Sequence, residues 1–421
     1  MTMTAEAERR PASAVLEEQV ARVGTCDLAI AFLTYNNADT LPAVLAAATR
    51  GVGERFSDAA VAFIGSDAGS TDGSPDLIAA SAMPSVLVRH EPPRAERVAV
   101  PFHGVPGRGA ALRGALGVAQ RLGARAVILL EADVVSLEPE WITRLATPVW
   151  EEKADFVVAA YARHRFDGTI TNLLVAPLVR ALYGRRVRQP LGGQQALSGR
   201  LVEHLLLHPK WDWAGRELAD VWILGAAIAD GFNVWEAWLG PRVIRSRTRT
   251  NDLPAMVAQT LGGVLAVMDR HDDLWREVRG SEPLNAVGDA TLPATEARDV
   301  DVDRMASAFR LGLRDLTPVW EHILAPDTLG DVLSLESADL RDFRFPDDLW
   351  ARVVYDFALG HHYSVIHRDH LLRSLVPLYL GRTAAYVLAT QGRGAAASEA
   401  AAEAVALAFE RQKPYLVERW T

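Results

Sequence analysis

Two carboxylates, Glu131 and Asp133, come directly after the apolar run 126–130. Such a run is typical of a strand buried on both faces of a parallel sheet, and these sheets bind ligands at the carboxyl ends of their strands. In an extended segment both carboxylates project to one side, where they repel each other unless a cation lies between them. A Mg2+ or Mn2+ ion held by phosphates takes one or two such carboxylates. A solvated acidic turn explains this motif equally well when it is taken alone.

Polar residues also follow two earlier apolar runs. Thr34, Tyr35 and Asn36 end the first run, and Asp67 ends the second within a stretch of small residues. Small residues let the backbone approach a ligand closely, and an aspartate there can accept hydrogen bonds from a nucleobase or a ribose. A capped turn is the alternative that needs no ligand.

Arg108 stands between two glycines at the start of a predicted helix, 107–123. Free backbone N–H groups at a helix start favour anions, and a guanidinium offers phosphate a bidentate fork. In chain order, Asp67, Arg108 and the acidic pair fall at corresponding ends of consecutive predicted strands. The sheet should therefore bring them to one edge.

The elements that must position these residues alternate between strand and helix. Strands are predicted at 27–35, 60–67, 85–90, 126–133, 155–163 and 233–239, with helices between them. This order predicts an α/β fold with a mostly parallel, doubly wound sheet. Beyond residue 251 long stretches carry helical spacing, which predicts a mainly α-helical C-terminal domain with a surface loop at 280–300. The expected parts are a flexible or helical tail at 1–24, an α/β domain at 25–250 and a helical domain at 251–421.

Composition narrows the class of protein. The 421 residues carry a net charge of -9, which disfavours a general nucleic-acid binder. The single cysteine, Cys26, excludes an intrachain disulfide and a cysteine-built zinc site. No run of 18 apolar residues is present, and the N-terminus lacks an apolar signal-peptide core. We therefore expect a cytoplasmic protein without a transmembrane segment.

The segment from Cys26 to about Asn251 resembles a nucleotide-sugar glycosyltransferase of the single-sheet A-type fold. LTYNNADTL and SDAGSTDGS are similar to the nucleotide-binding signatures of glycosyltransferase family 2, and EAD stands where that fold carries its Asp-x-Asp metal motif. ADVVSLEPEWI, RQPLGGQQALS and the helical C-terminal half resemble the mannosylglycerate synthase family, whose members are retaining enzymes.

The resemblance implies roles for particular residues. Asp67 would hold the base, Arg108 would contact the donor, and Asp133 with Glu131 would bind Mg2+ or Mn2+ on the diphosphate. The implied donor site also includes Thr34, Tyr35, Asn36 and Gln189. Residues implied near the transferred sugar, and hence near the catalytic centre, are Leu191, Gly192, Gly193 and Asp220. The implied acceptor site consists of Arg163, Arg165 and Thr169.

One departure from the family pattern concerns the metal. The relatives supply a histidine ligand after the last core strand, whereas this chain reads GPRVIRSRTRTNDL, with Ser246 near that place. Either the metal is bound more weakly through water, or Arg245 and Arg247 help to neutralise the diphosphate. Metal dependence is therefore left open.

The implied function is retaining transfer of a hexose, mannose or glucose, to a small hydroxy-acid acceptor such as glycerate. The implied donor is a nucleoside-diphosphate sugar such as GDP-mannose or UDP-glucose. An inverting family 2-like transferase acting on a polysaccharide or lipid-linked acceptor, with Asp220 as general base, is an alternative. A catalytically inactive nucleotide-sugar-binding protein is another. The helical domain would close over the acceptor or form a homodimer interface.

Overall fold

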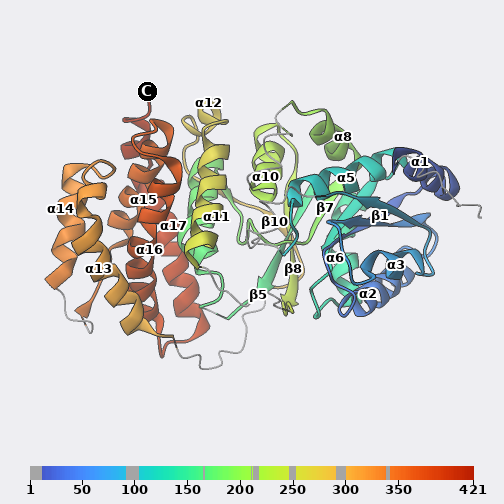
Figure 1. Ribbon diagram of the computed structural model, residues 1–421, viewed down its shortest axis with the longest axis horizontal. Coiled ribbons are helices and arrows are strands. Elements are labelled where there is room, and N and C mark those ends of the chain that lie inside the picture. Colours follow the sequence, from blue (N-terminus) through green and yellow to red (C-terminus); the bar gives the residue numbers. More distant parts are fainter. Residues whose placement is uncertain are drawn as a thin grey trace, which may run out of the picture.

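A mixed, mostly parallel sheet of eight strands, the last of them at residues 285–287, organises the α/β part of the molecule (Figure 1). The computed structural model describes residues 12–91, 104–164, 166–209, 211, 218–245, 253–290, 300–337 and 342–421. The strand order is β10-β8-β5-β7-β4-β1-β2-β3, and β7 runs antiparallel to both of its neighbours. The strands are β1 (Leu28–Thr34), β2 (Val61–Asp67), β3 (Ser85–Arg89), β4 (Ala126–Glu131), β5 (Phe156–Ala162), β7 (Gln195–Ser198), β8 (Val234–Pro241) and β10 (Asn285–Val287).

Helices cover both faces of this sheet (Figure 1). Along β1, Leu28, Ile30 and Phe32 belong to one apolar core, and the residues between them belong to the other. The first core is closed by α2 (Leu41–Arg55), α3 (Ser74–Ala79) and α6 (Pro139–Trp150). Helices on the other side are α1 (Ala12–Val23), α5 (Arg108–Arg121), α8 (Gly199–Leu207) and α10 (Ala219–Ala229). Because alternate side chains enter opposite cores, a parallel strand here is apolar throughout.

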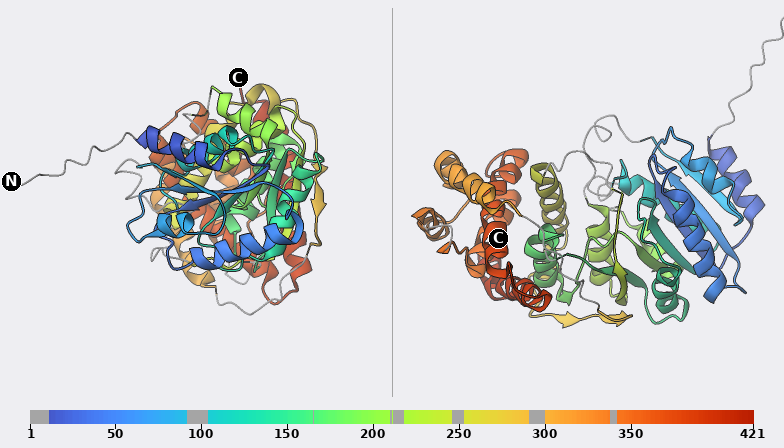
Figure 2. Two further views of the ribbon diagram at one scale, coloured as in Figure 1. Left: turned by 90° about the vertical axis from the view of Figure 1, so that its right-hand side faces the viewer. Right: turned by 90° about the horizontal axis from the view of Figure 1, so that it is seen from below.

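The C-terminal half is helical and continues the core of one sheet face. Its helices are α11 (Leu253–Met268), α12 (Asp272–Trp275), α13 (Val302–Trp320), α14 (Pro326–Ser334), the 3-10 turn η2 (Leu335–Ser337), α15 (Asp347–His362), α16 (Arg368–Thr390) and α17 (Ala395–Val417). The π-helix η1 (Thr171–Val175) and α7 (Ala176–Tyr183) pack against α17. The indole N–H of Trp350 donates to the carbonyl of Leu173 at 2.7 Å. Seen from below, the C-terminal helices α13 to α17 lie at one end of the long axis and β1 to β3 lie at the other (Figure 2).

The predicted α/β class and helical C-terminal region are confirmed, with two local corrections. A helix end at Gly51 is what the glycine itself predicts, but α2 continues to Arg55, because a glycine within a helix costs only about 1 kcal/mol and packing against α6 outweighs it. The stretch expected as a surface loop contains two short strands, β9 (Glu282–Pro283) and β10. β9 pairs with β6 (Arg185–Arg186), and β10 pairs with β8. None of the helices in the described ranges has the length and apolar character needed to span a bilayer.

Candidate active site

The carboxyl ends of three neighbouring strands bring the predicted polar residues to one edge of the sheet. In the parallel register, Thr34 lies beside Asp67, and Leu33 lies beside Glu131. The prediction that Asp67 and the acidic pair share an edge is therefore confirmed. It held because β1, β2 and β4 are hydrogen-bonded neighbours that run in the same direction.

Asp67 is buried and holds the loop that follows β2. One carboxylate oxygen accepts from the Thr34 hydroxyl at 3.0 Å, and the other accepts from the backbone N–H groups of Gly69 and Ser70 at 3.0 and 2.9 Å. With only 1% of Asp67 exposed, this bonding is the role that the structure assigns to it. Base binding by Asp67 stays a prediction.

The loops after β1 and β2 are joined into one unit. Asn36 adopts a left-handed backbone conformation with φ 55, which asparagine tolerates better than most residues. Its backbone N–H donates to the Ser70 hydroxyl at 2.8 Å, and its side-chain carbonyl accepts from the N–H of Thr71 at 2.9 Å. The N–H of Tyr35 donates to the side chain of Asn37 at 2.7 Å. These bonds explain much of the polar pattern of the two loops without a ligand.

Arg108 and Asp220 form a buried bidentate ion pair. Arg108 begins α5, and its Nε and Nη2 donate to the two oxygens of Asp220 at 2.7 and 2.8 Å. Asp220 lies in the first turn of α10, is fully buried, and also accepts from Gln195 at 3.2 Å. Burial alone would lower the pKa of Arg108, but the charges of Asp220 and Glu131 outweigh it and raise that pKa.

Glu131 is bound by two guanidinium groups. Its Oε1 lies 3.3 Å from Nη1 of Arg108, and its Oε2 accepts a hydrogen bond from Nη2 of Arg242. Arg242 is the residue directly after β8. Burial opposes the charged form of Arg242, yet the charge of Glu131 raises its pKa. Two arginines from distant segments therefore compensate a carboxylate that the sequence assigned to a metal.

The glycine pair is packed against the protein's own atoms. A Cβ on Gly192 would lie 2.4 Å from the carbonyl oxygen of Ala159, and one on Gly193 would lie 2.5 Å from Oε2 of Glu131. Gly193 also has φ +89, and its carbonyl accepts from Arg108 at 3.4 Å. Leu191 is buried. Contact of these residues with a donor sugar stays a prediction.

Arg163 and Arg242 both contact the ring of Tyr161. Their guanidinium carbons lie 5.5 and 5.3 Å from the centroid of the Tyr161 ring. Burial and, next to it, the charge of Arg242 lower the pKa of Arg163 to about 10. The Tyr161 hydroxyl donates to Gln194, and the backbone carbonyl of Tyr161 accepts from Gln189 at 2.8 Å.

Asp133 is less fully bonded than Glu131. Its Oδ1 is buried and has no hydrogen-bond partner within the described ranges, and a Cβ on Gly104 would lie 3.7 Å from its Oδ2. Burial and then the charge of Glu131 raise the pKa of Asp133 to about 6. Its backbone carbonyl accepts from the N–H of Arg245 at 3.0 Å.

These residues do not fit a divalent cation well. Both oxygens of Glu131 face guanidinium groups, and a divalent ion placed there would lie beside two like charges. Within the ranges that the structure describes, no group of three or more His, Cys, Asp or Glu side chains is arranged to hold a metal. Of the two carboxylates in the acidic pair, Asp133 is the one left for this purpose. Ser246 and Arg247 lie outside the described residues.

The predicted acceptor residues separate in the structure. The Thr169 hydroxyl lies 2.6 Å from the hydroxyl of Tyr379 on α16, so it contacts the helical half. Arg163 instead lies beside Arg242, in the cluster around Glu131. Arg165 is outside the described residues. Arg245, named as an alternative for the diphosphate, pairs with Asp39 at 2.7 Å and is largely exposed.

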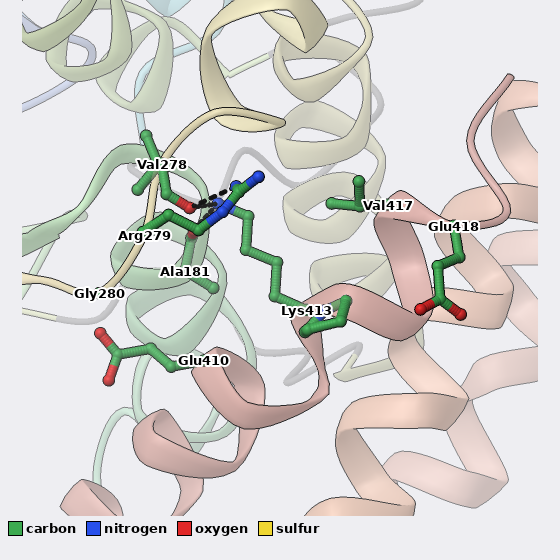
Figure 3. A pocket seen from close by; sticks show the side chains of 9 residues that line it. Ala181, Val278, Arg279, Gly280, Glu410, Lys413, Val417 and Glu418 are labelled. Atoms are coloured by element: carbon green, nitrogen blue, oxygen red, sulfur yellow. Dashed lines mark hydrogen bonds between the residues drawn. The ribbon is translucent and has the colours of Figure 1, made fainter.

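A separate cavity of about 320 Å³ lies among α7, the segment before β9, and α17 (Figure 3). Its lining includes Lys413, whose ammonium donates to the carbonyls of Ala181 and Val278 at 2.7 and 2.8 Å. None of the lining residues belongs to the cluster around Glu131. The two lysine bonds satisfy backbone carbonyls, which gives Lys413 a structural role.

Sequence reasoning missed three members of the cluster, namely Tyr161, Gln195 and Arg242. A signal existed for Arg242, because it follows a predicted strand just as Glu131 and Asp67 do. Gln195 lies within the short antiparallel strand β7, where the loop motif gave no indication of a strand.

No family model matches the chain, and neither does any curated protein. Among solved structures, the chain is similar to glucosyl-3-phosphoglycerate synthase from Mycobacterium tuberculosis in complex with Mn2+, uridine diphosphate and glucosyl-3-phosphoglycerate. That match has 23% identity and a TM-score of 0.43, and covers 63% of this chain and 86% of that one. The same enzyme with Mn2+, UDP-glucose and phosphoglyceric acid gives 22% identity, a TM-score of 0.43 and the same coverage. A structure described as a mycobacterial protein has 23% identity to this chain and a TM-score of 0.44. That match covers 61% of this chain and 78% of the other. We therefore argue function from the side chains of the site.

Proposed function

We propose that the protein is a retaining glycosyltransferase that moves a hexose, mannose or glucose, from a nucleoside-diphosphate donor to a small hydroxy-acid acceptor such as glycerate. One observation carries the proposal. Arg108, which starts α5, meets Asp220 of α10 and Glu131 at the end of β4, on the edge where parallel α/β sheets bind their ligands. The donor base would lie near the joined loops after β1 and β2.

The chemistry asked of the site is stabilisation of a leaving group. When the bond between the anomeric carbon and the phosphate oxygen breaks, negative charge grows on the diphosphate. Fixed guanidinium groups in a buried site stabilise that charge without having to reorganise. In a same-face mechanism the departing phosphate oxygen takes the proton of the acceptor hydroxyl as the new glycosidic bond forms.

The inverting alternative needs a free carboxylate as general base. Asp220 is poorly suited to this role, because both of its oxygens accept from Arg108 and one of them also accepts from Gln195. A carboxylate held in this way is a positioning residue for Arg108. This bonding favours retention over inversion.

The proposal is tested by a thermal-shift screen of GDP- and UDP-sugars, followed by acceptor trials with the stabilising donor. We expect an α-linked product from an α-linked donor, identified by NMR of the anomeric proton. A β-linked product would refute retention, and a screen in which no sugar nucleotide raises the melting temperature would refute the donor site.

A further inference from the structure

We propose that Arg163 and Arg242 take the place of a divalent cation, so that the donor diphosphate binds and leaves without a metal ion. The inference rests on the proposed function and specifies how that site handles the diphosphate. It assigns Arg163 to the donor, where the sequence had placed it with the acceptor.

The position of the pair supports this assignment. Arg242 donates to Glu131, the residue at the place of the first metal-motif carboxylate, and its charge also acts on Asp133. Arg163 and Arg242 both contact the ring of Tyr161, with their guanidinium carbons 5.5 and 5.3 Å from its centroid, and the charge of Arg242 acts on Arg163. Together the two arginines carry the charge of one divalent ion. Glu131 thus holds a guanidinium where the family pattern would have it hold a metal.

Unpaired donors in the pair point to an anionic ligand. Nη2 of Arg163 and Nε of Arg242 are buried and find no hydrogen-bond partner among the described residues. Burying such donors is costly unless an acceptor satisfies them, and phosphate oxygens match the fork of a guanidinium. Among the residues that the structure describes, Arg163 makes no ion pair with a carboxylate. Its charge is therefore available to a ligand.

Electrostatics distinguishes an anion from a cation at this point. The charge of Arg242 lowers the pKa of Arg163, so the two guanidinium groups repel each other, and a diphosphate bound by both would relieve that repulsion. A divalent cation would increase it and would compete with both arginines for Glu131. The arrangement of charges thus selects the diphosphate itself as the ligand.

The test is calorimetric titration of UDP and GDP into the full-length protein, in excess EDTA and in excess Mn2+. We expect the better nucleotide to bind in EDTA with a Kd within about threefold of that in Mn2+. The substitution Arg242→Gln should weaken binding in EDTA by about 10- to 150-fold, the usual effect of losing a charged hydrogen bond. Arg163→Gln should weaken it similarly.

Arg314→Gln is the control. Arg314 lies on α13 and is largely exposed, and it pairs with Asp315 at 2.7 Å. Its loss should leave Kd unchanged, which separates specific contacts from general positive charge. Because Arg242→Gln leaves Glu131 with one partner fewer, the double variant Glu131→Gln/Arg242→Gln is measured beside it, with circular dichroism to check folding.

The outcomes separate the inference from the function on which it rests. Binding that requires Mn2+, or an Arg242→Gln variant that binds as tightly as the wild type in EDTA, overturns the inference and leaves a metal-dependent transferase in place. No binding of either nucleotide, with or without Mn2+, overturns the donor site and the inference together.

Discussion

Replacing Gly193 with alanine should destabilise the protein through two effects that the structure separates. The residue has φ +89, and an alanine that keeps this left-handed conformation costs about 1–2 kcal/mol. The new Cβ would also lie 2.5 Å from Oε2 of Glu131. Glu131 is 2% exposed and bound by Arg108 and Arg242, so it cannot move without breaking a buried hydrogen bond, at a further cost of about 1–3 kcal/mol. We expect a total loss of about 2–5 kcal/mol.

Two other glycines provide matched controls for urea-induced unfolding followed by tryptophan fluorescence. Gly231 has φ +78 and nothing within 4 Å of an added Cβ, so Gly231→Ala reports the backbone cost alone. Gly192→Ala reports a steric clash without positive φ, since its Cβ would meet the carbonyl of Ala159 at 2.4 Å. If Gly193→Ala loses no more stability than Gly231→Ala, Glu131 is not held in place and the reasoning fails.

Two further predictions concern pH. Burial and the charge of Glu131 raise the pKa of Asp133 to about 6. At low pH the protonated carboxyl does not destabilise the folded state, but as pH rises through about 6 its ionisation lowers the free energy of unfolding. Asp133→Asn should therefore stabilise the protein by up to about 3 kcal/mol at pH 8 and by almost nothing at pH 4, as measured by urea unfolding. An equal gain at both pH values would contradict the assignment. Burial lowers the pKa of Lys413 from 10.5 to about 8. Below pH 8 the buried ammonium is charged and lowers the free energy of unfolding, and above pH 8 the side chain loses its proton and this penalty decreases. The stability of the wild type relative to Lys413→Met should rise with pH across this window, and a flat difference would contradict it.

The sequence predicts the edge of the sheet well because its signals are local. Apolar runs that end in polar residues identify β1, β2 and β4, and parallel pairing then brings Thr34, Asp67 and Glu131 together. The partners of these residues could not be predicted in this way. Asp67 and Asn36 form hydrogen bonds within the two loops. The sequence of a polar loop does not show whether its side chains bind a nucleotide or other residues of the loop.

Very short strands also could not be predicted from the sequence. β10 has three residues and joins the sheet from beyond the expected domain boundary, and β9 has two. Periodicity needs more residues than these strands contain. The same limit hides β7, which places Gln195 against Asp220.

The acidic pair shows why residue type and spacing do not fix the identity of a counter-charge. Glu131 and Asp133 were expected to need a cation because two adjacent carboxylates repel each other. The expectation of positive charge is correct for Glu131, but Arg108 and Arg242 provide it, from positions far away in the sequence. A guanidinium group and a metal ion can both compensate the charge of a carboxylate. A carboxylate motif alone therefore does not show which of the two is present. The distinction comes from a third group: Arg163 adds a further positive charge near the pair formed by Glu131 and Arg242, which is why we propose an anion and not a metal ion as the ligand there.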